Sequence, residues 1–395
     1  MALVYENDAV VGPATHVMVV GVGDYPHLIG GSSDIRAAKP AGMRQLTSPP
    51  VSAAAFADWA IGRFDNPARP LASVELLLGS APTEYTPPER GGIASPAKAS
   101  GVATLAEMKA AAVRWKARGN LHPDNLLIFY FCGHGLSKGN EYLIVASDYG
   151  GDMAEPMRGL IDIKRFLIGM KDCRARHQCY FIDACRASDE SLIDVDDYSD
   201  SLVQKLASPV AGLAQCVYYA TLGGETAQAI PNEPSFYTRA LIQSLNGVGA
   251  NNSNGGQWYV NTSRLFEALG HLMARISDPR LRERVLTPLS ESQVPFDIHL
   301  VGELPDLPIH VSIDTYRGEE PPPVVDALTF CQHTVDVARH PAGTPPLARS
   351  CDWQHRYFET WLKSGATTIM LDKQGAARRT EDFYLQPPGF TLEEW

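Results

Sequence analysis

Short apolar runs alternate with longer amphipathic segments over the first 300 residues of the chain. The apolar runs, rich in β-branched and aromatic residues, lie at His16–Val22, Ser73–Leu78, Asn125–Cys132, Gln178–Ile182 and Gln215–Thr221, with a weaker run at Phe296–Val301. Helical patterns lie between them at Ser52–Phe64, Thr104–Arg118, Ile161–Cys173, Phe236–Leu245 and Thr262–Ile276. Strands that are apolar throughout are typical of a sheet covered on both faces. The alternation predicts an α/β fold with layers of helices around a mostly parallel, six-stranded sheet.

The residue pattern changes after Gly302, where prolines become frequent and strand and helix patterns no longer alternate. We therefore predict one domain over residues 1–302 and a C-terminal extension over residues 303–395. Within the extension, a helix is expected around Trp353–Leu362 and a strand around Thr367–Leu371. Its role is not indicated by any pattern in its residues.

Charge and composition exclude several classes of protein. The net charge of −11 disfavours a nucleic-acid or anionic-membrane partner, because both require a basic face. No apolar run is long enough to span a membrane, and the N-terminal segment lacks the basic start of a signal peptide. The odd number of scattered cysteines, seven, suits a reducing compartment. The expected location is the cytoplasm.

Candidate chemistry appears at the ends of two of the apolar runs. LLIFYFCGHG ends at His134 and Gly135, and CYFIDACRAS ends at Asp183, Ala184 and Cys185. In a parallel α/β sheet, reactive groups collect at the carboxyl ends of the strands, where loops open into a crevice. The distance of 51 residues between His134 and Cys185 leaves room for one strand–helix–strand crossover.

These residue types suit nucleophilic catalysis. A thiol needs a partner that promotes its thiolate, and an imidazole does this and later protonates the leaving amine. Gly135 allows the backbone to approach a substrate and to direct an N–H at a developing oxyanion, with the amide of Cys185 as the second donor. We therefore interpret His134, Cys185 and Gly135 as catalytic. A backbone carbonyl near Tyr25–Pro26 is expected to orient the histidine.

The two blocks resemble the His-Gly and Asp-x-Cys blocks of the caspase, metacaspase and paracaspase superfamily, particularly its prokaryotic members. The resemblance covers about residues 14–302 and extends to VMVVGVGDYPHLIGGSSDI at the first strand and to Tyr218–Thr221 and Ser235–Thr238 after the nucleophile. It implies a three-layer caspase-like fold and a cysteine endopeptidase acting on proteins. Asp183 stands where caspases carry Gln, which departs from the caspase pattern.

The family cleaves after a charged side chain, so the acids near the nucleophile bear on specificity. Asp183 lies two residues before Cys185, so in a strand both side chains face the same way. A carboxylate there suits Arg or Lys before the scissile bond. By resemblance to metacaspases, Asp34 is the candidate for a second pocket acid and Asp24 the alternative. Helix capping by Asp34, a structural role for Asp183, and Asp specificity through Arg186 stay open.

The chain between the two halves of the predicted peptidase domain is dense in acids from Asp189 to Asp200. By resemblance, the domain divides into a large-subunit-like part, 1–187, a linker, 188–209, and a small-subunit-like part, 210–302. The linker is where such enzymes are processed from a zymogen, and Lys205 is the candidate site of self-cleavage. No cofactor is expected to be required. Calcium, which metacaspases often need, would be held by Asp148, Asp162 and Asp152.

Two other functions fit the same residues. The domain could be a binding module with an idle protease fold, although intact His134 and Cys185 argue against this. It could also be another Cys-His hydrolase, such as an amidase. Bacterial enzymes that resemble this chain act in stress responses, regulated death and antiviral defence, where an upstream protease or signalling protein switches them on.

Overall fold

The computed structural model describes residues 2–138, 141–184, 187–188, 200–220, 230–254, 256–274, 289–292, 294–302, 304–312, 325–332, 335–341, 351–352, 357–373 and 379–392. The chain divides into two compact units. The first contains Met1–Ile242 and Leu286–Leu300, and the second contains Gln243–Val285 and Val301–Trp395. The division into a peptidase domain, a linker and an extension stays a prediction.

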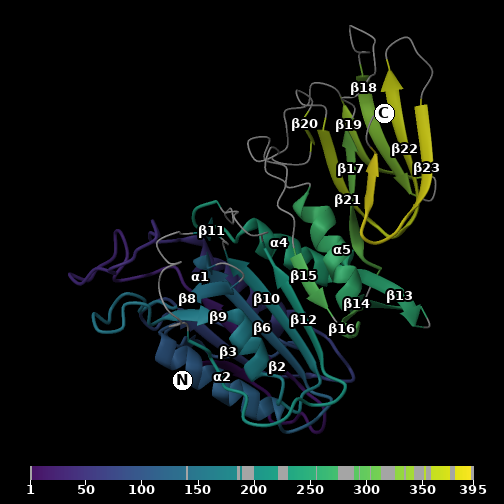
Figure 1. Cartoon of the computed structure of the whole chain (residues 1–395). Helices are drawn as coiled ribbons and strands as arrows, with labels where there is room; N and C mark the ends of the chain where they lie inside the picture. The colour runs from purple at the N-terminus through teal and green to yellow at the C-terminus, as the bar shows by residue number, and fades with distance from the viewer. Residues whose placement is uncertain are drawn as a thin grey trace. The chain divides into compact units, whose positions relative to one another are not determined.

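A central sheet forms the middle of the first unit, with the strand order β1-β3-β2-β6-β10-β12-β15 (Figure 1). Its strands are β1 (Leu3–Glu6), β2 (Thr15–Gly21), β3 (Leu71–Leu78), β6 (Leu126–Gly133), β10 (His177–Ala184), β12 (Ala214–Tyr219) and β15 (Leu289–Ser292). The five strands from β3 to β12 are parallel, and β15 is antiparallel to β12. These six strands form a mostly parallel sheet, five of them at predicted apolar runs, and β1 adds an antiparallel seventh at the edge.

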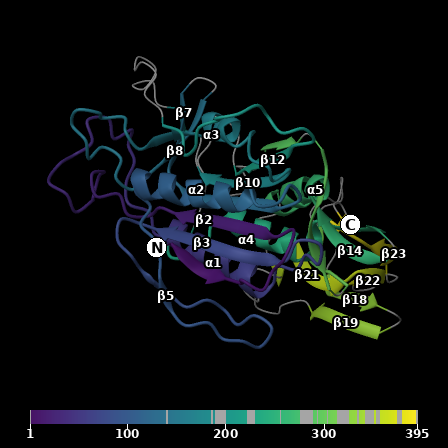
Figure 2. The ribbon, with the colours of Figure 1, turned by 90° about the horizontal axis from the view of Figure 1, so that it is seen from below.

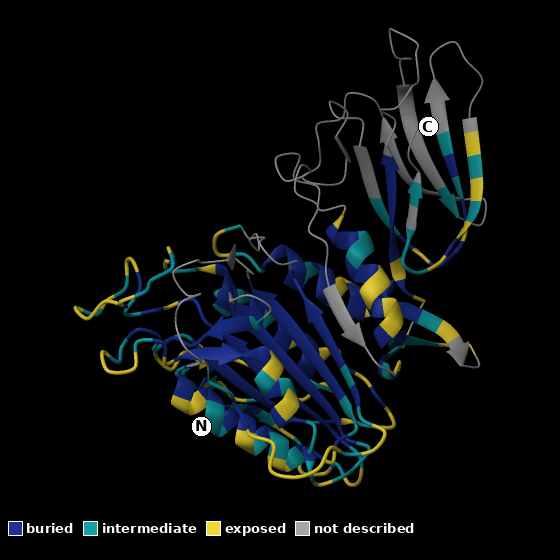
Figure 3. Cartoon of the chain, viewed as in Figure 1, coloured by how far each residue is buried: buried dark blue, intermediate teal, exposed yellow. Residues whose placement is uncertain are grey.

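Helices cover both faces of this sheet, so the three layers expected from the sequence are confirmed. In Figure 2, α2 (Leu105–Gly119) and α1 (Ser48–Gly62) lie on opposite sides of β2 and β3. Helix α3 (Ile163–Gly169) packs on the α2 side, where Phe166 contacts Trp115, and α4 (Phe236–Gln243) follows β12 in the chain. The strands between them are buried along nearly their whole length (Figure 3).

The register between β6 and β10 sorts aromatic side chains onto the two faces. Phe129 pairs with Tyr180, and both contact Phe166 on one face. The next pair, Tyr130 and Phe181, points the other way and contacts Phe56 of α1. Because successive strand residues alternate between faces, a continuous apolar run fills both layers of the core. This packing holds the ends of β6 and β10 side by side.

Helix boundaries follow local signals. Pro49 and Pro50 occupy the first turn of α1, where a missing N–H costs nothing. Thr104 caps α2 by accepting from the N–H of Glu107 at 3.4 Å, and Asp162 caps α3 by accepting from the N–H of Arg165 at 3.1 Å. The predicted helix at Ile161–Cys173 is therefore shorter than expected and starts only after Asp162.

A second, smaller sheet in the first unit has the order β11-β7-β8-β9. Its strands are β7 (Gly135–Lys138), β8 (Glu141–Val145), β9 (Leu160–Asp162) and β11 (Ala187–Ser188). Strand β7 begins two residues after β6 ends, and β11 begins three residues after β10 ends. A short hairpin, β4 (Glu84–Tyr85) with β5 (Lys98–Ala99), completes the minor sheets of this unit.

The prediction of the sixth strand was wrong in its position. The run at Phe296–Val301 forms β16 (Asp297–Val301), which lies outside the central sheet. The edge position next to β12 is taken by β15, whose sequence LSES has no apolar run. An edge strand pairs through its backbone on one side only, so it needs no continuous apolar sequence.

The second unit contains a short π-helical turn (Ser244–Val248), a hairpin of β13 (Ala250–Asn254) and β14 (Gln257–Asn261), helix α5 (Thr262–Met273) and two four-stranded sheets. One sheet has the order β20-β21-β17-β24, and the other has the order β19-β18-β22-β23. Their strands are β17 (Asp306–Ser312), β18 (Val325–Gln332), β19 (Val335–Pro341), β20 (Cys351–Asp352), β21 (Tyr357–Lys363), β22 (Gly365–Lys373), β23 (Arg379–Leu385) and β24 (Phe390–Leu392).

One prediction for this region is confirmed and one is wrong. The strand expected at Thr367–Leu371 lies within β22. The helix expected around Trp353–Leu362 is strand β21 over its described part, where Leu362 pairs with Leu307 of β17. The apolar residues at 357, 358, 361 and 362 suit a helix or a strand, and pairing with a distant strand decides between them.

Candidate active site

His134 follows the last residue of β6, and a backbone carbonyl holds its ring. Nε2 of His134 lies 2.6 Å from the carbonyl oxygen of Arg44, in the loop between β2 and α1. A carbonyl oxygen only accepts hydrogen bonds, so Nε2 carries the ring proton in the neutral imidazole. Nδ1 is then the basic nitrogen. The ring is set to accept a proton at Nδ1.

The predicted orienting carbonyl near Tyr25–Pro26 is therefore replaced by that of Arg44, and Tyr25 has a different role. The Tyr25 hydroxyl accepts from the backbone N–H of His134 at 2.9 Å, and the two rings lie 4.9 Å apart. Gly133 makes room for this contact, because a Cβ at this position would lie 2.9 Å from the Tyr25 hydroxyl oxygen. Tyr25 itself is completely buried and is a rigid neighbour of the histidine.

The surroundings of His134 favour the neutral ring. Burial lowers the pKa of His134 below its usual 6.5, and the hydrogen bond to the Arg44 carbonyl opposes that shift. Desolvation is the larger effect, since removing water penalises the charged imidazolium. A neutral imidazole at pH 7 is the form that a general base requires.

Cys185 lies outside the described residues, but the strand pairs on both sides of it are described. Ala184 pairs with Gly133 at the end of β10 and β6. Ala187 pairs with Leu136 between β11 and β7. The offset is 51 residues in both pairs (184 to 133 and 187 to 136), the same as the spacing between Cys185 and His134. The register is therefore the same on both sides of residues 185 and 186.

Gly135 is the first residue of β7 and pairs with Ile144 of β8. The carbonyl of His134 accepts from the N–H of Val145 at 3.1 Å, so β8 holds the backbone at the histidine. A role of the Gly135 amide as an oxyanion donor stays a prediction.

Asp183 is buried at the end of β10, with 2% of its surface exposed. Its Oδ2 accepts from three hydroxyls: Thr238 at 2.6 Å, Tyr130 at 3.3 Å, and Ser235. Burial raises the pKa of Asp183 above 3.8, and these hydroxyls and the Cys132 thiol oppose that shift. Ser235 also accepts from the N–H of Thr238 at 2.9 Å, so the start of α4 is tied to this carboxylate.

The other two predicted pocket acids lie in exposed chain. Asp24 follows β2 and accepts a hydrogen bond from the hydroxyl of Ser80. Asp34 is exposed in the loop between β2 and α1. The alternative that Asp34 caps a helix is wrong, because the next helix, α1, begins at Ser48. Asp24 and Asp34 share no contact with Asp183 among the hydrogen bonds of the described chain.

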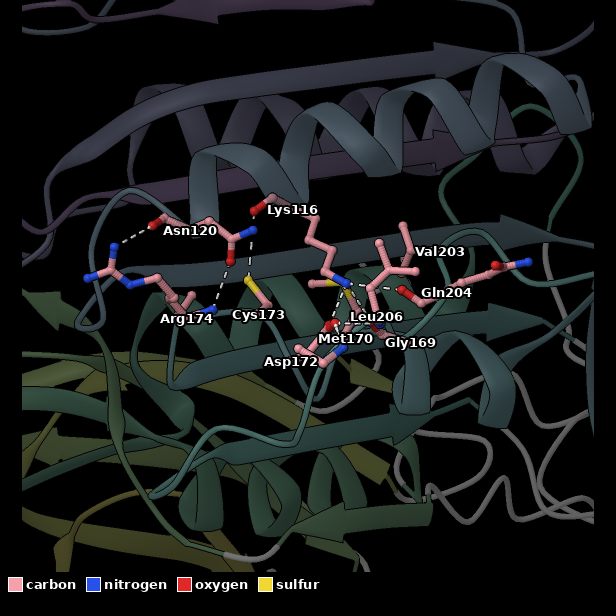
Figure 4. A network of polar contacts seen from close by, with 12 residues as sticks. Lys116, Asn120, Gly169, Met170, Asp172, Cys173, Arg174, Val203, Gln204 and Leu206 are labelled. Carbon is pink, nitrogen blue, oxygen red and sulfur yellow. Dashed lines mark hydrogen bonds and ion pairs between the residues drawn. The ribbon is translucent and has the colours of Figure 1, made fainter.

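Lys205, the predicted site of self-cleavage, is exposed in a segment that is bound on both sides of it. Figure 4 shows Lys116 of α2 with its Nζ 2.5 Å from Asp172, 2.8 Å from the Gly169 carbonyl and 3.2 Å from the Gln204 carbonyl. The other oxygen of Asp172 accepts from the N–H groups of Leu206, at 2.7 Å, and Ala207, at 3.0 Å. We call Lys116 and Asp172 the linker clamp.

The three predicted calcium ligands do not come together. Asp148 accepts from the N–H of Leu105 at 2.8 Å, Asp162 caps α3, and Asp152 accepts from the N–H of Ala154 at 2.9 Å. Throughout the described parts of the chain, no group of three or more His, Cys, Asp and Glu side chains is arranged to hold a metal ion. Each carboxylate instead accepts from a backbone N–H at the start of a helix or in a turn.

Sequence reasoning missed the partners of the histidine and of Asp183. The carbonyl of Arg44 has no signature in the sequence, because every residue carries one. Tyr25, and Gln45 beside Arg44, lie in a loop without periodicity. Ser235 gave a readable signal, since a serine directly before an apolar helical pattern is a common cap.

One family model and one relative are similar to this chain in sequence. Residues 100–284 match the family model of the caspase domain, and this stretch contains both His134 and Cys185. The chain is 25% identical over 243 residues to the uncharacterized protein y4kE of Sinorhizobium fredii; the match covers 58% of this chain and 70% of that protein.

Two solved structures are similar at low sequence identity. Protein GSU0716 from Geobacter sulfurreducens matches with a TM-score of 0.40 and 12% identity, covering 71% of this chain and 93% of that one. Caspase-1 from Spodoptera frugiperda matches with a TM-score of 0.37 and 10% identity, covering 71% and 88%. None of the helices in the described chain has the length and apolar character of a membrane span. From the family match, residues 100–284 of this chain are similar to the caspase domain, a similarity that covers less than half of the chain.

Proposed function

We propose that this protein is a cysteine endopeptidase in which Cys185 is the nucleophile and His134 is the general base. One observation carries the proposal: the pairs Gly133–Ala184 and Leu136–Ala187 flank His134 and Cys185 with the same register. Paired strands are about 4.8 Å apart, so the residues that flank Cys185 lie beside those that flank His134, which supports Cys185 as the partner of the histidine. The ring of His134, with Nε2 on a carbonyl, keeps Nδ1 for the thiol.

The chemistry follows from that tautomer. Nδ1 of His134 takes the thiol proton, and the thiolate sulfur bonds to the substrate carbonyl carbon while the π electrons move to oxygen. In this proposal, the amides of Gly135 and Cys185 donate to the oxyanion. When the C–N bond breaks, the imidazolium returns its proton to the leaving amine. Water then hydrolyses the thioester with His134 again as base, which restores the thiol.

We assign a preference for Arg or Lys before the scissile bond, with Asp183 as the charged partner. Asp183 lies two residues before Cys185, so in an extended chain the two side chains point to the same face. The three hydroxyls that donate to Asp183 all bind Oδ2. A carboxylate whose pKa is raised by burial gains most from a cation, because the cation restores its ionised form. The exposed acids Asp34 and Asp24 are the second-acid candidates on the substrate side.

Processing within residues 188–209, with Lys205 as the candidate bond, would convert a zymogen to the active form. The run of acids between Asp189 and Asp200 is the sequence feature that favours this linker as the region of processing. An intracellular role in stress, cell-death or defence signalling, with an upstream activating protein, extends this proposal. Calcium dependence is tested by adding the ion or a chelator to the same assay.

The proposal is tested with the full chain and a panel of fluorogenic peptides that carry Arg, Lys, Asp or a neutral residue before the reporter. We expect turnover of the Arg and Lys peptides. Cys185→Ala and His134→Ala each lower kcat/KM by at least about 10³-fold, because nucleophile and base act as one unit. An active-site titration with an electrophilic Arg peptide should label only chains that retain Cys185. Turnover that persists in Cys185→Ala would overturn the mechanism.

A further inference from the structure

The side chain of Gln45 makes three hydrogen bonds to the backbone of the loop between β2 and α1. Its Oε1 accepts from the N–H of Tyr25 at 2.8 Å. Its Nε2 donates to the carbonyl of Tyr25 at 2.9 Å and to that of Ile29 at 3.2 Å. One amide therefore satisfies both backbone groups of Tyr25, as a paired strand would. Only Asn and Gln carry a donor and an acceptor side by side in this way.

The residues that Gln45 joins are the two partners of His134. Tyr25 accepts from the backbone N–H of the histidine through its hydroxyl, at 2.9 Å. Arg44, the neighbour of Gln45 in the chain, accepts from Nε2 through its carbonyl, at 2.6 Å. Gln45 thus fixes the distance between the group that holds the histidine backbone and the group that holds its ring.

This loop has few other restraints on the Arg44 carbonyl. Residues 22–47 contain no helix, and Arg44 forms a single isolated bridge with Ile29. The N–H of Leu46 donates to the Gly23 carbonyl at 2.9 Å, on the other side of Gln45. Arg44 is exposed, so water can compete with His134 for its carbonyl. A shift of about 1 Å in such a partner is enough to lower a rate about 10²-fold.

We propose that Gln45 is a positioning residue, which acts on catalysis through the Arg44 carbonyl by holding His134 in the tautomer with its proton on Nε2. This inference rests on the proposed function, because the tautomer of His134 affects the rate only if His134 is the general base. The hydrogen bonds of the glutamine go to the backbone of Tyr25 and Ile29. Its contribution is a fixed geometry of the loop.

The test compares Gln45→Met and Gln45→Glu with the wild type. Methionine keeps the length and makes none of the hydrogen bonds; glutamate keeps the acceptor for the Tyr25 N–H and loses both donations. We expect kcat to fall about 10- to 100-fold in Gln45→Met, with a smaller fall in Gln45→Glu and little change in KM. Tyr149→Phe is the control, since the Tyr149 hydroxyl binds the same loop at the Lys39 carbonyl, 2.8 Å away, without contact to His134.

A second readout does not depend on turnover. NMR of ¹⁵N-histidine-labelled protein reports which ring nitrogen carries the proton, and the His134 signal is assigned by its loss in His134→Asn. The wild type and Tyr149→Phe should show the Nε2-protonated form, and Gln45→Met a mixture of both tautomers. An unchanged tautomer and an unchanged kcat in Gln45→Met, with Cys185→Ala inactive, would overturn this inference and leave the peptidase intact. Turnover in Cys185→Ala would instead overturn the peptidase while the tautomer result stands.

Discussion

His134, after β6, and Asp183, at the end of β10, show how the surroundings of a residue set its pKa. Burial lowers the pKa of His134 and raises that of Asp183, because in both cases the charged form loses its water. Each group then has compensating partners: the Arg44 carbonyl for the histidine and three hydroxyls for the aspartate. The histidine is thus kept neutral, and the carboxylate gains from any cation that reaches it.

The specificity assigned to Asp183 is tested by Asp183→Asn. The substitution keeps a side chain that can bond to the hydroxyls of Ser235 and Thr238 but removes the negative charge. We expect kcat/KM for an Arg peptide to fall about 10- to 100-fold, the equivalent of a charge-assisted hydrogen bond. A peptide with a neutral residue at the same position should change much less. The comparison is made by steady-state kinetics on the same panel of peptides.

A matched control separates the charge from the hydrogen-bond network. Thr238→Val removes the hydroxyl that donates to Oδ2 at 2.6 Å and keeps the carboxylate. It should lower stability and leave the preference for Arg over neutral peptides in place. Equal losses on Arg and neutral peptides in Asp183→Asn would show that the carboxylate is structural.

At the scale of elements, residues 200–207, in the second part of the linker, are bound to α2, β9 and the turn after α3. The backbone of Asp200 pairs with Leu160 and Asp162, Leu202 and Val203 are buried, and the linker clamp holds Gln204, Leu206 and Ala207. A peptidase needs its substrate extended across the catalytic groups, so the bond after Lys205 has to leave these contacts before it is cut. The linker clamp therefore protects the candidate processing site.

Lys116→Met should open the linker clamp. The Lys116 and Asp172 side chains are 14% and 6% exposed, so removal of the lysine leaves a poorly solvated carboxylate. We expect the free energy of unfolding to fall by about 3 kcal/mol. In the inactive Cys185→Ala background, trypsin should cut after Lys205 at least about tenfold faster. The rates come from mass spectrometry of timed digests.

Lys109→Met is the comparison for this effect. Lys109 pairs with Asp200 at 2.6 Å in the same segment, but their side chains are 40% and 22% exposed. An exposed pair contributes less than about 1 kcal/mol, so cleavage after Lys205 should change little. If both variants accelerate trypsin equally, the linker clamp has no special role at Lys205.

At the scale of the whole molecule, buried histidines link the stability of the first unit to pH. His16 and His299 are each 5% exposed. Desolvation lowers the pKa of both to about 4, from 6.5, with Arg118 as a second cause at His16. Nδ1 of His16 bonds to the Ser73 hydroxyl at 2.8 Å, and Nδ1 of His299 accepts from the N–H of Asp65 at 2.9 Å.

The sign of the pH dependence of stability follows from the lowered pKa values of the two histidines. The folded chain holds fewer protons on these histidines than the unfolded chain, so their contribution is fully present above pH 6.5. It is lost as the pH falls from 6.5 toward 4, by about 3 kcal/mol for each histidine. Urea unfolding at pH 7.5, 6, 5 and 4.5 should show this decrease. His299→Asn, whose Oδ1 replaces Nδ1 as acceptor, should make it shallower, and a constant stability over this range would contradict the linkage.

The sequence by itself determined the elements whose signals are local. Continuous apolar runs marked the five parallel strands, since a strand covered on both faces has no polar positions. The same runs located His134 and Cys185, because each stands directly after the last buried residue of its strand. The family resemblance rested on those two blocks, and the caspase-domain match over residues 100–284 agrees with it.

The tertiary structure alone decided which groups meet. It supplied the Arg44 carbonyl and the Gln45 amide around His134, placed β15 instead of β16 at the sheet edge, made Tyr357–Lys363 a strand, and assigned the predicted calcium acids to backbone caps. Backbone carbonyls are identical in every residue, and pairing depends on partners far away in the chain. No local pattern predicts which carbonyl meets a side chain or which strands pair, because these contacts arise only when distant segments pack together.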